Sequence, residues 1–210
     1  MGFGNWWDQT VVPRIIKLGC ATEDIMALRR DVVPQAQGAV FELGCGGGIN
    51  QRLYDAGRVT SFAGLDPSGK GLDYAREAAA KKGWQADIRQ GFGEAIPFDD
   101  ESFDTVVCTF TLCSVADQAR TLSELRRVLR PGGTFLYAEH GRSPDAKIAR
   151  RQERIDPLWK KVFGGCHLSR PVTSAIEAAG FTAAPVGQRY MKDKPSMAGW
   201  LEWGVAVKPA

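Results

Sequence analysis

Metal-binding and disulfide patterns are missing from this sequence. Its 210 residues include only 2 histidines and 5 cysteines, and no two cysteines stand in C-x-x-C spacing. Zinc sites usually show such paired ligands in the sequence, so we expect no metal site. An odd number of scattered cysteines also does not fit a disulfide framework. Both absences favour reduced thiols in a cytoplasmic protein.

Strong charge and long apolar runs are absent as well. The formal net charge is only +3, from 27 basic and 24 acidic residues. No run of Lys and Arg suggests a surface for a polyanion, so we expect no nucleic-acid partner. No stretch approaches the roughly 20 apolar residues of a membrane span. The residues after Met1 also lack the basic start and apolar run of a signal peptide.

The chain does contain apolar strand-like runs that alternate with helical patterns. An apolar content of 44% over this length predicts one domain with a substantial core. The alternation predicts an α/β fold with a mostly parallel sheet, whose ligands bind at the carboxyl ends of the strands. We expect strands over 39–43, 59–65, 86–89, 103–109, 134–139, 181–190 and 199–207, and helices over 23–31, 49–56, 68–82, 116–129, 142–161 and 169–180.

A glycine loop follows the first expected strand. Glycines stand at positions 44, 46 and 48, directly after Glu42 and Leu43. Without a Cβ, this backbone can approach a ligand closely. A dinucleotide fingerprint would need glycine at 49, where the chain has Ile49. Asp66 ends the next expected strand, and a carboxylate there can accept two hydrogen bonds from the vicinal hydroxyls of a ribose.

Five ordered motifs resemble the class I S-adenosylmethionine-dependent methyltransferases of the type 11 group. They are the segments 42–48, 65–68, 95–98, 102–107 and 129–133. A narrower resemblance rests on residues 108–115, 139–140, 156–159 and 165–170, together with 203–208. It is to small bacterial methyltransferases related to the animal enzymes that methylate alkyl thiols and hydrogen sulfide.

This resemblance implies S-adenosylmethionine as the cofactor and S-adenosylhomocysteine as its product. It places Gly44, Gly46 and Gly48 under the methionine part of the cofactor, with Thr109 at the amino-acid end. Glu42 would hold the loop or reach the amino group through water. Asp66 would lie at the ribose, and Pro67, Gly93 and Glu94 near the adenine. Phe92 stands where many relatives have Asp, so ring packing replaces one adenine contact.

The resemblance also implies an overall plan for the chain. We expect a Rossmann-like seven-stranded sheet, with helices on both faces and the last strand antiparallel. A single methyltransferase domain over 1–210 would consist of an N-terminal helical lid at 1–36, a cofactor-binding core at 37–140 and a substrate side at 141–210. The tryptophans Trp6 and Trp7 in the first segment fit either a lid helix or a peripheral membrane contact.

Few residues could serve the methyl acceptor. His140 follows the fifth strand and is a candidate base or a structural hydrogen-bonding group, and His167 lies in a glycine-flanked loop that either closes over the site or is a surface turn. Glu139 fits a cofactor-side contact or a structural role. Cys113 fits a position facing the substrate or packing as a small apolar residue. Cys45 carries no expected chemistry.

We expect methyl transfer to a small-molecule nucleophile, with a thiol or sulfide as the first choice. A thiol with a pKa near 8.5 already supplies some thiolate at neutral pH and needs only a modest base. One alternative is N- or O-methylation of a lipid headgroup or quinone-like phenol, which the basic stretch at 142–161 would serve. Another is a catalytically silent cofactor-binding subunit.

Overall fold

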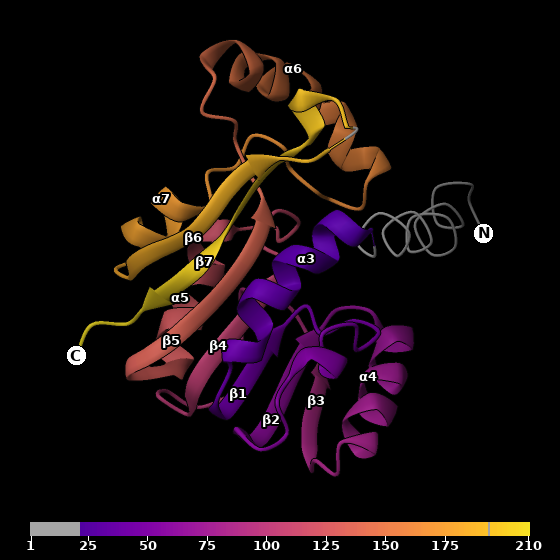
Figure 1. Cartoon of the computed structure of the whole chain (residues 1–210), viewed down its shortest axis with the longest axis vertical. Helices are drawn as coiled ribbons and strands as arrows, with labels where there is room; N and C mark the ends of the chain where they lie inside the picture. Colours follow the sequence, from indigo (N-terminus) through magenta and orange to yellow (C-terminus); the bar gives the residue numbers. More distant parts are fainter. Residues whose placement is uncertain (1–21, 193) are drawn as a thin grey trace.

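The computed structural model describes residues 22–192 and 194–210, which build one seven-stranded sheet flanked by helices (Figure 1). The strand order across the sheet is β3-β2-β1-β4-β5-β7-β6. The strands are β1 Gly38–Leu43, β2 Val59–Asp66, β3 Ala86–Gln90, β4 Phe103–Thr109, β5 Leu129–His140, β6 Thr182–Tyr190 and β7 Trp200–Val207.

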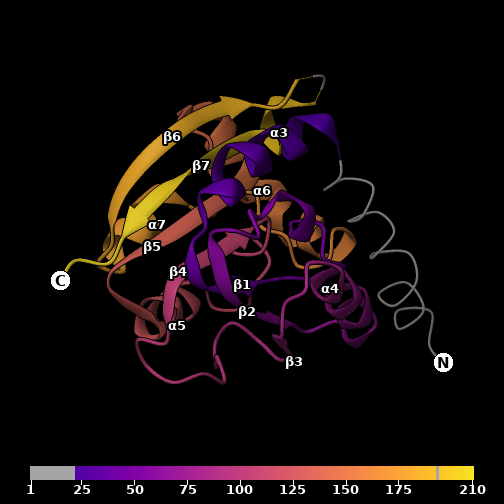
Figure 2. The ribbon, with the colours of Figure 1, turned by 60° about the horizontal axis from the view of Figure 1, so that its bottom comes forward.

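Strand direction in the sheet confirms the Rossmann-like prediction. β1 pairs in parallel with β2 and β4, β2 pairs in parallel with β3, and β4 pairs in parallel with β5. The last strand, β7, is antiparallel to both of its neighbours, β5 and β6. Figure 2 shows β6 at one margin of the sheet and β3 at the other. The strand order reverses between β1 and β4, so their carboxyl ends form the crevice where ligands of such sheets bind.

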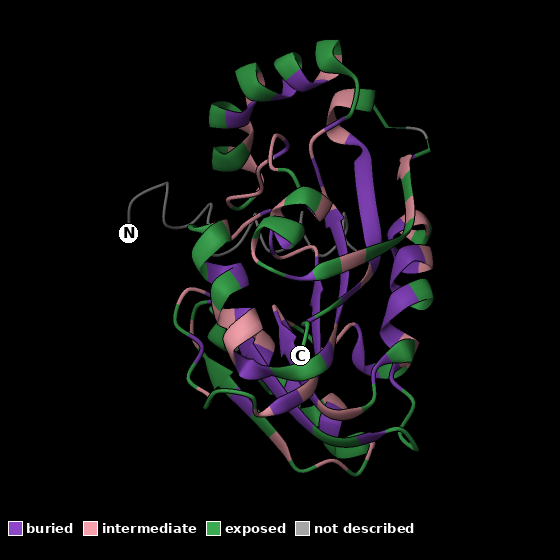
Figure 3. Cartoon of the chain, turned by 90° about the vertical axis from the view of Figure 1, so that its left-hand side faces the viewer, coloured by how far each residue is buried: buried purple, intermediate pink, exposed green. Residues whose placement is uncertain are grey.

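Alternating side chains of the central strands fill two separate cores, one on each face. The helices α3 Glu23–Val32 and α4 Gly69–Lys81 cover one face, where their buried residues join those of the strands. The helices α5 Gln118–Val128 and α7 Thr173–Ala178 cover the other. Figure 3 shows the central strands largely buried and the outer sides of the helices exposed. The edge strands β3 and β6 consist mostly of exposed or half-buried residues. Helices on both faces were predicted, and this is confirmed.

The basic stretch forms the helix α6 Ala146–Val162, which lies beyond the arrowhead of β5 in Figure 1. Its N-cap Asp145 accepts hydrogen bonds from the backbone N–H groups of Lys147 and Ile148. Its basic side chains face solvent, whereas Ala149, Gln152 and Asp156 are buried. No helix in the described part of the chain is long and apolar enough to cross a membrane.

Two local expectations are wrong, and one lies outside the description. The helix expected over 49–56 is reduced to a single 3-10 turn, η3 Gln51–Leu53. Tyr54 is extended because its hydroxyl turns inward to Glu42. The helix expected over 169–180 is shortened to α7 Thr173–Ala178. Trp6, Trp7 and the first part of the predicted lid fall outside the described residues.

Candidate active site

The glycine loop turns sharply at the end of β1. Gly44, Gly46 and Gly48 have φ angles of 74°, 42° and 73°, a region that disfavours residues with a Cβ. The N–H of Gly44 donates to the carbonyl of Leu65 at 2.8 Å. A Cβ on Gly44 would lie only 1.9 Å from Oγ1 of Thr111, so the loop runs against the segment that follows β4.

Asp66 stands at the end of β2 beside this loop. Its Oδ2 accepts from the N–H of Gly46 at 2.9 Å, and its Oδ1 accepts from the N–H of Ser68 at 2.8 Å. Burial raises the pKa of Asp66, and these two bonds oppose that effect. Because a carboxylate has about four acceptor positions, each oxygen keeps one for a ligand hydroxyl.

A buried polar network supports the loop from beneath. Glu42 accepts from the hydroxyl of Tyr54 at 2.8 Å and from the amide nitrogen of Asn50 at 2.9 Å. Asn50 also donates to Oγ1 of Thr109 at 2.9 Å. Burial raises the pKa of Glu42 to about 7, although Tyr54, Arg29 and Asn50 act in the opposite direction. Of the two roles considered for Glu42, the contacts match the one that holds the loop.

Arg29 extends from α3 into the same network and was not anticipated from the sequence. Its Nη1 donates to Oδ1 of Asn50 at 2.7 Å and to Oγ1 of Thr109. Its guanidinium lies 5.0 Å from the ring centroid of Phe110, although the residue is only 5% exposed. The signal available in the sequence was an arginine among apolar residues, four positions after Ile25 and three before Val32.

The adenine-side candidates lie in the loops after β2 and β3. Gly93 is buried, and a Cβ there would lie 2.8 Å from Cγ2 of Thr121. Glu94 accepts from the N–H of Asp117 at 3.0 Å, which connects this loop to the start of α5. Pro67 is exposed at the same edge, and Phe92 is 67% exposed, free to pack on a planar ligand.

Glu139, next to the acceptor candidates, is fully engaged by the backbone. Its Oε1 accepts from the N–H groups of Thr111 and Leu112 at 2.8 and 3.0 Å, and its Oε2 accepts from that of Cys113 at 3.2 Å. Burial raises its pKa, and these three donors lower it. Of its two expected roles, the geometry matches the structural one, because the carboxylate fixes the segment after β4.

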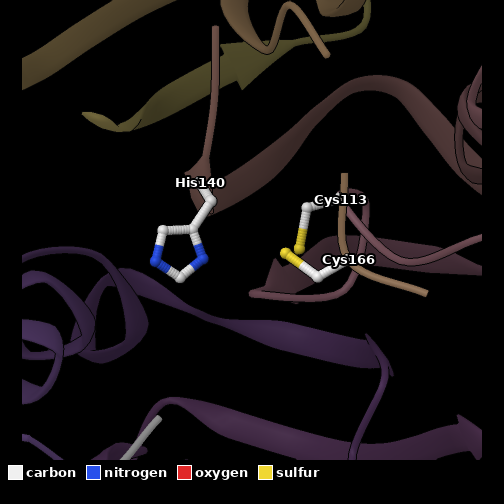
Figure 4. Close-up of side chains that lie close together, drawn as sticks. All are labelled: Cys113, His140 and Cys166. Carbon is white, nitrogen blue, oxygen red and sulfur yellow. The ribbon is translucent and has the colours of Figure 1, made fainter. Parts of the chain in front are cut away.

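The fold brings His140 together with two cysteines. One ring nitrogen of His140 and the sulfurs of Cys113 and Cys166 all lie within 4.8 Å of one another, and Figure 4 shows the sulfurs facing each other beside the imidazole. A hydrogen bond from Cys113 and the proximity of His140 lower the pKa of Cys166, and the pKa of Cys113 is raised correspondingly. Sequence spacing does not reveal this cluster, because 27 and 26 residues separate its members. The expectation of no metal site rested on the absence of paired cysteines in the sequence, and the fold assembles a possible ligand set without such a pair.

His167 is held away from this cluster by an acidic partner. Its Nδ1 lies 2.6 Å from Oδ2 of Asp156 in α6. The other oxygen of Asp156 accepts from the N–H of Leu168 at 2.6 Å. The geometry therefore indicates that His167 ties its loop to α6.

A cavity of about 500 Å³ opens at the opposite edge of the sheet. Its lining residues lie at the amino ends of β1, β2 and β4 and in β5, and include Arg58, Asp104 and Arg130. Arg130 is already paired with Asp104. This cavity is far from the glycine loop along the strands and is not the predicted site.

Comparisons with known proteins decide the family. A family model described as "Methyltransferase domain" matches residues 41–137. Human thiol S-methyltransferase TMT1B is 35% identical over 181 residues, which cover 79% of this chain and 67% of that protein. The chain belongs to the S-adenosylmethionine-dependent methyltransferases.

Other methyltransferases are similar over shorter stretches or in fold alone. Phosphatidylethanolamine N-methyltransferase of Cereibacter sphaeroides is 37% identical over 124 residues, 57% of this chain and 60% of that protein. The crystal structure of an S-adenosylmethionine-dependent methyltransferase from Mesorhizobium loti has a TM-score of 0.64 at 21% identity, covering 89% of this chain and 98% of that one. The chain spans about 60% of the length of several animal thiol S-methyltransferases that it matches.

The cofactor of this methyltransferase is S-adenosylmethionine, and the residues at the carboxyl edge fit it. A Cβ on Gly46 would meet no atom closer than 3.6 Å and one on Gly47 none within 4 Å, so the loop leaves open space for a ligand beside these two glycines. Asp66 has acceptor positions for ribose hydroxyls. The buried cation of Arg29 lies at the end of β4, where it would match the carboxylate of the methionine part.

Proposed function

We propose that this methyltransferase transfers the methyl group of S-adenosylmethionine to the sulfur of a small thiol or sulfide. The observation that carries the proposal is the acceptor side, where an imidazole and two sulfurs meet at the carboxyl end of β5. The nearby carboxylates of Glu139 and Asp156 are occupied by backbone N–H groups and His167. Neither of these two carboxylates is left to receive an ammonium headgroup.

The cofactor supplies an activated methyl group and its own leaving group, so the chain mainly has to align the two reactants. Gly44, Gly46 and Gly48 would form the floor under the methionine part of the cofactor, and Arg29 would bind its carboxylate. Asp66 would bind the ribose hydroxyls, and Pro67, Gly93 and Glu94 would border the adenine. Thr109 and Glu42 would support the amino-acid end from beneath. All of these residues lie at the carboxyl edge or directly beneath it.

His140 would prepare the acceptor. The imidazole accepts the thiol proton and later releases it to solvent. The acceptor sulfur then forms a bond to the methyl carbon while the carbon–sulfonium bond breaks and leaves its electron pair on the cofactor sulfur. Phe110 packs edge-on against the imidazole, with 5.2 Å between ring centroids, and limits its rotation.

A lipid headgroup is the second candidate acceptor. The observation that favours it is the outer surface of α6, where basic side chains surround Leu158, which is 69% exposed. A membrane contact through this surface would bring a headgroup toward the carboxyl edge. The similarity to the phosphatidylethanolamine enzyme adds support.

A panel of acceptors tests the proposal. Purified full-length protein would be incubated with S-adenosylmethionine and either small alkyl thiols, sulfide or phosphatidylethanolamine vesicles, with products identified by mass. We expect S-methyl thioethers, loss of their formation in His140→Gln with cofactor affinity retained, and continued turnover in His167→Gln. Methylated headgroup without methylated thiol, or wild-type turnover in His140→Gln, would refute this assignment.

A further inference from the structure

We propose that Cys113, His140 and Cys166 form a site for a thiophilic divalent cation, best matched by zinc. The three residues come from separate segments: the turn after β4, the end of β5 and the loop after α6. Each offers one ligand atom, and the three atoms lie within 4.8 Å of one another. Figure 4 shows all three side chains converging on one point.

Hydrogen bonds between the two loops hold this convergence in place. The carbonyl of Cys113 accepts from the N–H of His167 at 2.8 Å, next to Cys166 in the chain. Arg170 donates through Nη1 to the carbonyls of Val115 and Leu112 at 2.6 and 3.1 Å. The two loops that carry the sulfurs are therefore held together by hydrogen bonds that do not involve the sulfurs themselves, as a preorganised ligand set requires.

The donor atoms select the kind of ion. Two sulfurs and one imidazole nitrogen suit zinc and other borderline or soft ions, whereas magnesium and calcium prefer oxygen ligands. Zn–S bonds of about 2.3 Å and Zn–N bonds of about 2.0 Å at tetrahedral angles separate two sulfurs and one nitrogen by roughly 3.5 to 3.8 Å. Side-chain movements of about 1 Å would reach that geometry.

Three protein ligands leave one tetrahedral position open, which is the arrangement of catalytic rather than structural zinc sites. The open position would take the sulfur of the methyl acceptor, an extension that rests on the proposed function. Phe110 connects the proposed metal site to the cofactor side, because its ring contacts both His140 and the Arg29 guanidinium. With the ion bound, His140 would be a metal ligand and no longer the base, so on coordination the acceptor thiol would release its proton directly to solvent. After methyl transfer the neutral thioether is a weaker ligand and leaves.

Cobalt(II) is a spectroscopic probe that tests the site without measuring activity. Full-length protein, reduced and freed of metal with a chelator, would be titrated with Co²⁺ and then with competing Zn²⁺. We expect one equivalent of Co²⁺ with sulfur-to-metal charge-transfer absorption and tetrahedral d–d bands, both removed by Zn²⁺. Cys113→Ser and Cys166→Ser should lose the charge-transfer intensity, and His140→Gln should bind at least about tenfold more weakly.

Cys45→Ala is the matched control, because Cys45 is buried in the glycine loop and is not part of the cluster. Its Co²⁺ spectrum should equal that of the wild type. Equal binding by the wild type and the Cys113→Ser/Cys166→Ser double variant would overturn the metal site. A Cys113–Cys166 disulfide that persists under reductant would overturn it too.

Activity measurements keep this inference separate from the proposed function. Thiol methylation by protein that binds no metal would refute the site and leave the thiol assignment standing. One equivalent of bound Co²⁺ in a protein that methylates headgroups but no thiol would retain the metal site and refute its role for an acceptor sulfur.

Discussion

The carboxylate of Asp66 accepts a hydrogen bond from the backbone N–H of Gly46, with 2.9 Å between Oδ2 and the nitrogen. This bond joins the ends of the neighbouring strands β1 and β2. One side chain therefore shapes the glycine loop and offers the acceptor positions proposed for the ribose.

Replacing Asp66 with alanine should weaken the binding of S-adenosylmethionine at least tenfold. The expected loss corresponds to about 1.4 kcal/mol, as for one charge-assisted hydrogen bond. Isothermal titration would measure it, with Asp73→Ala on the exposed surface of α4 as the control. An unchanged dissociation constant for Asp66→Ala would contradict the ribose assignment.

Arg29→Lys should weaken cofactor binding by about tenfold through a different part of the ligand. Lysine keeps the charge but loses the planar fork that can contact Asn50, Thr109 and a carboxylate together. Methylthioadenosine, which lacks the amino-acid part, should bind Arg29→Lys as tightly as wild type, whereas Asp66→Ala should weaken both ligands. Equal losses for both ligands in Arg29→Lys would show that Arg29 acts only by holding the loop.

The strands were predictable because they are short, continuous apolar runs bounded by turn residues. The fourth was expected over 103–109 and is observed as Phe103–Thr109. Its burial on both sides explains the lack of alternation in Val106-Val107-Cys108. The prediction that the site lies at the carboxyl ends of the strands followed directly from the parallel arrangement.

The side-chain networks were not predictable, because periodicity reports only local structure. Arg29 and Thr109 are 80 residues apart, and only the folded sheet shows that they meet. Inward hydrogen bonding by Tyr54 likewise shortened the expected helix over 49–56. The cluster of Cys113, His140 and Cys166 was unpredictable for the same reason, because it forms only where three separate segments meet at one edge of the folded sheet.

Gly44→Ala should destabilise the protein and Gly47→Ala should not, although both residues stand in one loop. A Cβ at 44 would meet Oγ1 of Thr111 at 1.9 Å on a backbone with φ of 74°, whereas a Cβ at 47 meets nothing within 4 Å. We expect Gly44→Ala to lower the free energy of unfolding by about 2 kcal/mol or more and to reduce cofactor affinity. Gly47→Ala should stay within about 0.5 kcal/mol of wild type. Urea denaturation and titration measure both quantities, and similar behaviour of the two variants would contradict the loop geometry.

Glu42 should make the protein less stable as the pH rises from about 4.5 to about 7. Its pKa is about 7 in the folded state and near 4.5 when exposed, because burial disfavours the charge. Between these values the folded state binds more protons than the unfolded state, so the free energy of unfolding falls with increasing pH. The full effect is about 3 kcal/mol, at 1.36 kcal/mol for each pH unit.

Urea denaturation at pH 5 and pH 8 measures this dependence. In Glu42→Gln the decrease between the two pH values should be smaller than in wild type by most of that amount, about 2.5 kcal/mol, because the amide cannot ionise. A residual decrease should remain, since burial also raises the pKa of Glu139 and Asp66. Glu77→Gln, at an exposed position on α4, should keep the wild-type dependence. The same decrease in Glu42→Gln and in wild type would show that Glu42 ionises at its ordinary pKa, and that its bonds to Tyr54 and Asn50 outweigh burial.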